Sequence, residues 1–149
     1  MRKITIIGSG NIGFALAKGL VQRAYCAAAD ITLTRRHLQS LQAEQSLGFG
    51  VSTDNAAAIA GADVIVLAVL PQQIKKVMLE IQAQVRAHQI VVSVASGVTC
   101  AAIQEVLGAH TAVVRAMPNT AIAIGQSMTC IATEGASAEQ VDTVVTMFE

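Results

Sequence analysis

Short apolar runs alternate with segments of helical periodicity along most of the chain. The runs predict strands at residues 3–7, 31–34, around 51, 64–69, 90–94, 112–116 and 128–132. The periodic segments predict helices at residues 11 to about 24, 37–45, 56–60, about 73 to 84, 100–107 and from 137 onward. Such alternation is typical of an α/β fold in which helices cover both faces of a mostly parallel sheet. We therefore expect one doubly wound α/β domain over residues 1–149.

Two of the predicted helices carry specific expectations. The segment 37–45 should bury Leu38 and Leu41. The last segment begins at Ser137 with Gln140 three residues later, which is the spacing of a capping box. Its apolar positions, Val141, Val144, Val145 and Phe148, should form one face, and no Gly, Asn or Pro follows to end the helix.

The composition narrows the class of protein. Apolar residues make up 53% of the chain and charged residues 13%, which excludes intrinsic disorder. The longest apolar run, residues 64–70, is far shorter than the ~20 residues that cross a bilayer. The three cysteines form no CxxC pair and the histidines have no metal-ligand spacing. We expect a reduced, cytoplasmic protein with no metal site.

The charge balance argues against nucleic acid as a partner. Ten basic and ten acidic residues give a net charge of zero. The first third is nevertheless cationic, because its only acid up to residue 36 is Asp30. This surplus suits a ligand that carries phosphate, although ordinary surface scatter explains it equally well.

A glycine-rich motif, GxGxxG, follows the first predicted strand and opens the first predicted helix. It comprises Gly8, Ser9, Gly10, Asn11, Ile12 and Gly13. In this context the motif is the fingerprint of a Rossmann-type dinucleotide site. Gly8 allows the tight turn, Gly10 lets the backbone approach a pyrophosphate, and Gly13 lets the helix pack close to the strand. The alternative is a purely structural glycine turn.

The end of the second predicted strand indicates which dinucleotide is bound. NAD enzymes usually have Asp or Glu there to hold the ribose 2′-hydroxyl. This chain has Thr34, Arg35 and Arg36, and Asp30 lies at the wrong end of the strand. A hydroxyl and two guanidiniums would bind a 2′-phosphate by charge-assisted hydrogen bonds. We expect NADP(H) as the cofactor; the alternative is that these arginines are merely solvated.

Five stretches together resemble the N-terminal domain of the pyrroline-5-carboxylate reductase family. They are residues 7–12 (IGSGNI), 53–55 (TDN), 67–72 (LAVLPQ), 92–98 (VSVASGV) and 114–120 (VRAMPNT). They occur in the family's order over nearly the whole chain. The MPNT sequence is the most specific of them, because generic Rossmann domains lack it.

The resemblance implies a role for each matching stretch. It places the glycine loop at the pyrophosphate, and Thr34, Arg35 and Asn55 around the adenosine. The residues implied to line the cofactor toward the nicotinamide are Ala68, Val69, Leu70, Pro71, Ala95, Ser96 and Gly97. The residues implied to lie near nicotinamide and substrate are Met117, Pro118, Asn119 and Thr120, although Pro118 and Asn119 also suit a simple turn.

The resemblance also implies an activity. Family members reduce the C=N bond of 1-pyrroline-5-carboxylate with NADPH to give L-proline, in proline and hence amino-acid biosynthesis. They place substrate-binding and catalytic residues in a helical C-terminal domain that forms dimers or higher oligomers. No part of that domain is recognisable here, so we expect the 149 residues alone to be inactive.

Two departures from the family's pattern keep other functions open. Leu70 stands where the family usually has Lys, and Ala121 where it usually has Pro. These differences put the substrate in more doubt than the cofactor. The alternatives are a related oxidoreductase, such as an imine reductase or a coenzyme F420-dependent NADP reductase, or a non-catalytic NADP-binding module.

Overall fold

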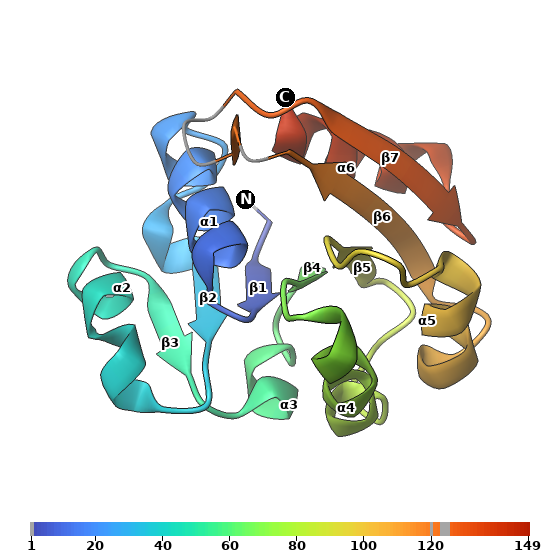
Figure 1. Ribbon diagram of the computed structural model, residues 1–149, viewed down its shortest axis with the longest axis horizontal. Helices are drawn as coiled ribbons and strands as arrows, with labels where there is room; N and C mark the ends of the chain where they lie inside the picture. Colours follow the sequence, from blue (N-terminus) through green and yellow to red (C-terminus); the bar gives the residue numbers. More distant parts are fainter. Residues whose placement is uncertain (1, 120, 123–125) are drawn as a thin grey trace.

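A seven-stranded sheet forms the centre of the protein in a computed structural model that describes residues 2–119, 121–122 and 126–149 (Figure 1). The strands are β1 (Ile4–Ile7), β2 (Ile31–Thr34), β3 (Gly50–Ser52), β4 (Val64–Leu67), β5 (Ile90–Ser93), β6 (Ala112–Pro118) and β7 (Thr129–Glu134). The α-helices are α1 (Asn11–Gln22), α2 (Gln42–Ser46), α3 (Asn55–Ala58), α4 (Pro71–Ile81), α5 (Cys100–Leu107) and α6 (Ala138–Phe148). Two 3₁₀ turns, η1 (Ala28–Asp30) and η2 (Leu38–Leu41), complete the described elements.

The strand order confirms the predicted fold class. The order is β3-β2-β1-β4-β5-β6-β7; β1 to β6 run parallel and β7 runs antiparallel to β6. From β1 the chain builds outward to β2 and β3, then crosses back to β4 on the other side of β1. Ile7 is in register with both Thr34 and Leu67, so β1, β2 and β4 end at the same level. In open α/β sheets, ligands bind at this switch in direction, beyond the carboxyl ends of the strands.

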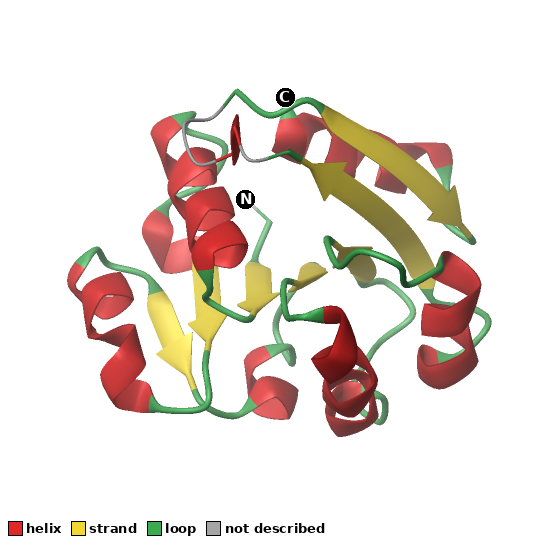
Figure 2. Cartoon of the chain, viewed as in Figure 1, coloured by secondary structure: helices red, strands yellow, loops and turns green. Residues whose placement is uncertain are grey.

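Helices lie on both faces of the sheet, and its central strands are buried on both sides (Figure 2). One core packs α1, α6 and the segment around α2 on one face, and the other packs α3, α4 and α5 on the opposite face. Every residue of β1, β4 and β5 is buried. This two-sided burial explains why those strands read as unbroken apolar runs.

The prediction of one continuous helix at 37–45 that buries Leu38 is wrong. The segment forms the 3₁₀ turn η2 followed by the short helix α2, and Leu38 is 57% exposed whereas Leu41 is fully buried. A continuous helical face does not form, because the chain changes from three to 3.6 residues per turn within the segment. The expectation that Leu38 belongs to the core is therefore incorrect.

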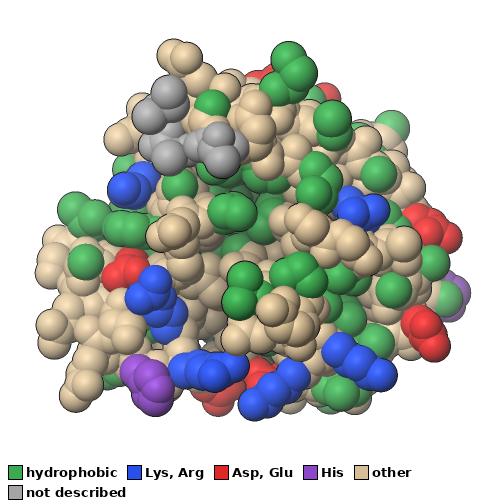
Figure 3. Space-filling model, in the orientation of Figure 1, with side chains coloured by type: hydrophobic (Ala, Val, Ile, Leu, Met, Phe, Trp, Pro, Cys, Tyr) green, Lys and Arg blue, Asp and Glu red, His purple; other side chains and the backbone are tan. Residues whose placement is uncertain are grey.

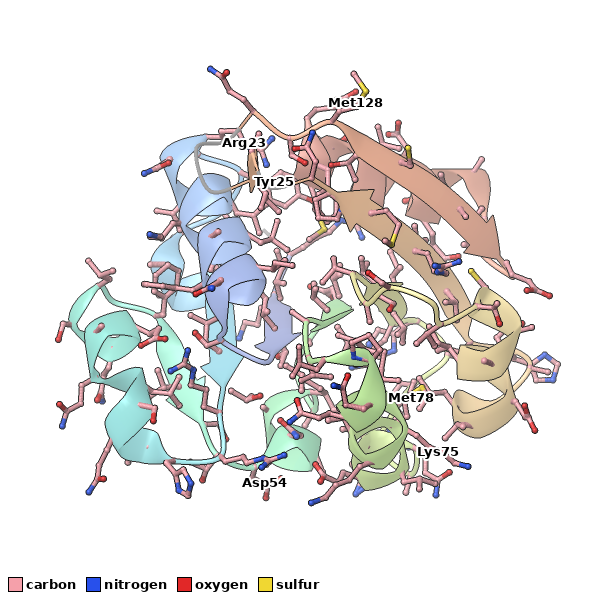
Figure 4. All side chains as sticks on the ribbon, viewed as in Figure 1. Arg23, Tyr25, Asp54, Lys75, Met78 and Met128 are labelled. Atoms are coloured by element: carbon pink, nitrogen blue, oxygen red, sulfur yellow. The ribbon has the colours of Figure 1, made fainter. Side chains whose placement is uncertain are left out.

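Several strand boundaries and the last helix also differ from expectation; β1, β4 and β5 are each one or two residues shorter than predicted. The final strand starts at Thr129, one residue later than predicted, and leaves Met128 79% exposed at the upper end of the molecule (Figure 4). Strand β6 continues to Pro118, because β7 pairs with its residues 113–118. Helix α6 buries Val144 fully, while Val141 and Val145 are only partly covered.

Helix α6 is tied to helix α1 by a hydrogen bond between their carboxyl ends. The guanidinium Nη2 of Arg23, just past the end of α1 (Figure 4), donates to the Met147 carbonyl at 2.5 Å. The capping box at Ser137 and Gln140 is present in both directions, as predicted. The bond fixes α6 against the same sheet face as α1. Within the residues described, none of the helices is both long and apolar enough to cross a membrane.

Candidate dinucleotide-binding site

A pocket of about 780 Å³ opens at the carboxyl ends of β1, β2, β4 and β5. The structure brings to it all of the predicted cofactor-binding residues except Gly13 and Gly97. These residues lie at or just after the carboxyl ends of five strands, β1 to β5, and they meet because these parallel strands end at one edge of the sheet. The volume is in the usual range for small-molecule and cofactor pockets.

The three glycines of the loop have three different environments. Gly8 adopts a φ of +100°, and a Cβ there would lie 2.6 Å from the Ala68 carbonyl oxygen. A Cβ on Gly13 would lie 2.1 Å from the Gly8 carbonyl oxygen, so Gly13 permits the close packing of α1 on the loop. A Cβ on Gly10 would meet nothing within 4 Å. Gly8 and Gly13 are therefore required by the fold itself, whereas Gly10 faces open space at the pocket.

The N-terminus of α1 presents backbone N–H groups at the pocket. Gly10 is the N-cap and supplies no side-chain cap, and the first helical bond runs from Phe14 N–H to the Gly10 carbonyl at 2.9 Å. The N–H groups at the start of a helix have no partner within the helix, and the helix dipole makes this end partly positive. Asn11 and Ile12 line the pocket here. The arrangement is suited to an anion such as a pyrophosphate.

Gly8 and Ser9, the first two residues of the glycine loop, are held by hydrogen bonds to β2 and α2. The N–H groups of Gly8 and Ser9 both donate to the Thr34 carbonyl, at 3.3 and 3.0 Å. The Ser9 hydroxyl donates to Glu44 Oε1 at 2.6 Å, and both side chains are buried. The Ser9 side chain is therefore buried against α2 and bonded to Glu44.

A hydrogen-bonded chain lies at the end of β2. The buried Thr34 hydroxyl donates to Asn55 Oδ1 at 2.7 Å, and Asn55 Nδ2 donates to Glu80 Oε2 at 2.8 Å. The hydroxyl proton of Thr34 is thus engaged with Asn55, and the side-chain donors that remain for an anion at this end are the exposed guanidiniums of Arg35 and Arg36. Arg35 Nη1 donates to the Ser40 carbonyl at 3.3 Å. Asp30 lies in η1, at the opposite end of β2.

One stripe of α4 lines the pocket and was not predicted. Its residues are Gln73, Lys76, Val77 and Glu80. Their spacing puts them on one face of a helix, and this spacing was the available signal. The predicted helix starts two residues too late, because Pro71 occupies its first turn, where proline is favoured. Lys76 brings the cationic side chains lining the pocket to three, against the single acid Glu80.

One margin of the molecule is rich in cationic side chains. Lys and Arg side chains gather along the lower edge of the view, over α3 and α4 (Figure 3). Asp54 stands on the same edge, where its side chain caps α3 by accepting from the Ala57 N–H at 3.0 Å (Figure 4). The pocket therefore has a cationic rim at the end of β2 and α4.

The loops after β4 and β5 supply the other walls of the pocket. Ala68, Val69, Leu70 and Pro71 line it from one side, and Ala95 and Ser96 line it from another. Leu70 is 59% exposed, and Ile12 across the loop is 42% exposed. Gly97 follows Ser96 with a φ of +73°, so it turns the loop. The nicotinamide end predicted from the resemblance is thus mostly apolar.

The residues predicted near the substrate lie outside this pocket. Met117 and Pro118 belong to β6, and Asn119 follows it; Thr120 falls outside the described residues. Asn119 Oδ1 accepts from the Ala121 N–H at 3.1 Å, which is the contact of a local turn. Cys100, at the start of α5, has a buried thiol, and this burial raises its pKa above the usual range and keeps it protonated at neutral pH.

The chemistry of the pocket fits a phosphorylated dinucleotide. It combines a helix N-terminus without a side-chain cap, open space above Gly10, apolar walls and a cationic end. Among the described residues, no three His, Cys, Asp or Glu side chains come together as a metal site.

Comparison with known proteins agrees with this geometry. A family model described as "NADP oxidoreductase coenzyme F420-dependent" matches residues 3–97. Pyrroline-5-carboxylate reductase 2 of Dictyostelium discoideum is 37% identical over 148 residues, covering 93% of this chain and 50% of that protein. The chain therefore spans about half the length of this curated relative.

Two solved structures show the same fold. A pyrroline-5-carboxylate reductase from Coxiella burnetii superposes with a TM-score of 0.92 at 32% identity, covering 99% of this chain and 55% of that one. The Plasmodium falciparum pyrroline carboxylate reductase, solved with NADP bound, has a TM-score of 0.89 at 20% identity, covering 99% and 54%. The second likeness supports the fold alone.

Proposed function

The chain belongs to the NADP oxidoreductase coenzyme F420-dependent family, and from this membership we propose that it is the NADP(H)-binding part of a pyrroline-5-carboxylate reductase. The observation that carries the proposal is the pocket at the switch point of the sheet. There the start of α1 meets the cationic end of β2, and Arg35 and Arg36 replace the acid of an NAD site.

In this proposal each wall of the pocket has a distinct task. The backbone at the start of α1 binds the pyrophosphate, and Arg35 and Arg36 bind the 2′-phosphate with charge-assisted hydrogen bonds. Asn55, held by Thr34 and Glu80, lies beside the adenosine ribose. The apolar surfaces of Ile12 and Leu70 flank the dinucleotide and exclude water.

The cofactor supplies the hydride for reduction of a C=N bond, and this chain supplies binding and orientation. Met117, Pro118, Asn119 and Thr120 are proposed to face the substrate. Because the described pocket lacks an evident nucleophile–base pair, we assign no catalytic residue within it. Substrate-binding groups are proposed to lie in the part of the relatives that this chain does not span.

An acid at position 35 should narrow or reverse the preference for NADPH over NADH. In Arg35→Asp, a carboxylate replaces a guanidinium at the end of β2 and repels the 2′-phosphate. A hydrogen bond to a charged group is worth roughly 1.5–3 kcal/mol, so NADPH affinity should fall about 10- to 100-fold while NADH affinity changes little. Calorimetric titration of both nucleotides measures this.

Arg86→Asp is the matched control, because it makes the same charge change on an exposed residue that does not line the pocket. It should leave both affinities near those of the parent chain. A loss of NADPH affinity as large in Arg86→Asp as in Arg35→Asp would show that net charge, and not a 2′-phosphate site, sets the preference.

The activity itself is tested by following NADPH oxidation with 1-pyrroline-5-carboxylate and identifying proline. The chain extended to the length of its relatives should form proline, whereas the 149 residues alone should bind NADPH without turnover. Reduction of coenzyme F420 or of unrelated cyclic imines, without proline formation, would instead assign the protein to a related oxidoreductase. NADPH binding without any reduction by the extended chain would favour a non-catalytic module.

A further inference from the structure

We propose that Glu44 is a positioning residue for the pyrophosphate loop, acting through the Ser9 hydroxyl; this inference rests on the proposed binding of NADP(H). The bond from Ser9 Oγ to Glu44 Oε1 is 2.6 Å long and joins residues that are 35 positions apart. It connects the second residue of the glycine loop to helix α2, an element that does not line the pocket.

The burial of both partners makes this contact unusual. Ser9 has no exposed surface and Glu44 is 3% exposed. A buried carboxylate loses its hydration, so it persists where a specific partner compensates for that loss. A hydroxyl bonded to an ionised carboxylate is a short, charge-assisted hydrogen bond, stronger than a bond between neutral groups. Position 44 therefore holds an ionisable acceptor, although an apolar side chain would be sufficient if the position only filled space.

The geometry of the loop shows what this bond controls. The N–H groups of Gly8 and Ser9 are both held by the Thr34 carbonyl, on the same side as Glu44. Ser9 is thus fixed through its backbone to β2 and through its side chain to α2. The next residue, Gly10, has no side chain and faces open space, so Ser9 is the last residue before α1 that a side-chain hydrogen bond holds.

A phosphate-binding backbone depends on such an anchor. N–H donors stabilise an anion most when they are already held in place, because no reorganisation is then needed on binding. Removing the anchor should therefore weaken ligands that carry a pyrophosphate. It should not weaken a ligand that reaches only the 2′-phosphate site, nor alter the ratio of NADPH to NADH affinity.

Three variants separate positioning from simple stability. Ser9→Ala removes the donor and leaves a buried, unpaired carboxylate. Ser9→Ala combined with Glu44→Met removes both polar groups, and replacement of both partners by apolar groups can be nearly neutral for stability. Glu44→Gln keeps an oxygen acceptor of the same size and should bind NADPH almost like the parent.

The experiment titrates NADPH, NADH and 2′-AMP into each variant and records thermal unfolding in parallel. In Ser9→Ala the affinities for NADPH and NADH should both fall, by the same factor of roughly five to ten, with 2′-AMP unchanged. The double variant should regain thermal stability yet keep the reduced NADPH affinity. That combination distinguishes a positioning role from a structural one.

Two results would overturn the inference. NADPH affinity that returns to the parent value together with stability in the double variant would reduce the pair to a packing contact. An equal loss for 2′-AMP would show that the pair supports the whole pocket and not the loop. If the parent chain bound 2′-AMP and NADPH no better than adenosine, the proposed function would fail instead, before any variant is compared.

Discussion

Gly10→Val is expected to abolish NADPH binding and leave a folded protein. The backbone at Gly10 has ordinary dihedral angles, φ −84° and ψ −163°, and a Cβ there meets nothing within 4 Å. The two γ-methyl groups of valine would occupy the space at the start of α1 where a pyrophosphate must approach the backbone. We expect no saturable NADPH binding by calorimetry and an unfolding free energy within about 0.5 kcal/mol of the parent.

Gly19→Val provides the matched control. Gly19 lies in α1, the helix that Gly10 caps; a Cβ there also meets nothing within 4 Å, and the residue does not line the pocket. This variant should bind NADPH like the parent chain. Undiminished binding by Gly10→Val would mean that the loop is only a structural turn.

Gly13→Ala, unlike Gly10→Val, should cause a large loss of stability. Its Cβ would be placed 2.1 Å from the Gly8 carbonyl oxygen and 3.1 Å from Ile6 Cγ2. Neither neighbour can yield easily, because the Gly8 N–H is bonded to the Thr34 carbonyl and Ile6 is fully buried. We expect a loss of about 3 kcal/mol or more of unfolding free energy, at the upper end for overpacking.

Urea unfolding measures this loss, with Gly19→Ala as the reference. Alanine favours a helix over glycine by up to about 1 kcal/mol, so Gly19→Ala should be as stable as the parent or more so. If Gly13→Ala matched it, the close packing of α1 against the loop would not be needed for folding. The pair Gly10 and Gly13 thus separates the binding role of the motif from its structural role.

The local pattern of the sequence was sufficient to predict the strands and the glycine loop. Strands β1, β4 and β5 are buried on both faces, so each appears as a continuous apolar run. The motif from Gly8 to Gly13 has a strand before it and a helix after it, and that context predicted the location of the pocket. Arg35 and Arg36 directly follow β2, whose last residue, Thr34, is in register with Ile7 before the glycine loop, so they lie at the same edge of the sheet.

Contacts between distant segments could not be predicted in this way. Ser9 meets Glu44, and Asn55 meets Glu80, across 35 and 25 residues. Neither acid belongs to a motif, and each acquires a role only when its helix is placed against the loops. On α4 the apolar stripe that includes Ile74 and Met78 indicated the buried face. The spacing of Lys76 and Glu80 indicated a second shared face, but its contact with the pocket depends on how α4 packs against the sheet.

The central claim is that the pocket between β1, β2 and β4 binds NADP(H) and selects it by its 2′-phosphate. Isothermal titration of the 149-residue chain with NADPH and with NADH tests this most directly. We predict a single saturable site for NADPH with an affinity roughly tenfold or more above that for NADH, as one charged hydrogen bond would give. Equal affinities for the two nucleotides, or no binding of NADPH, would contradict it.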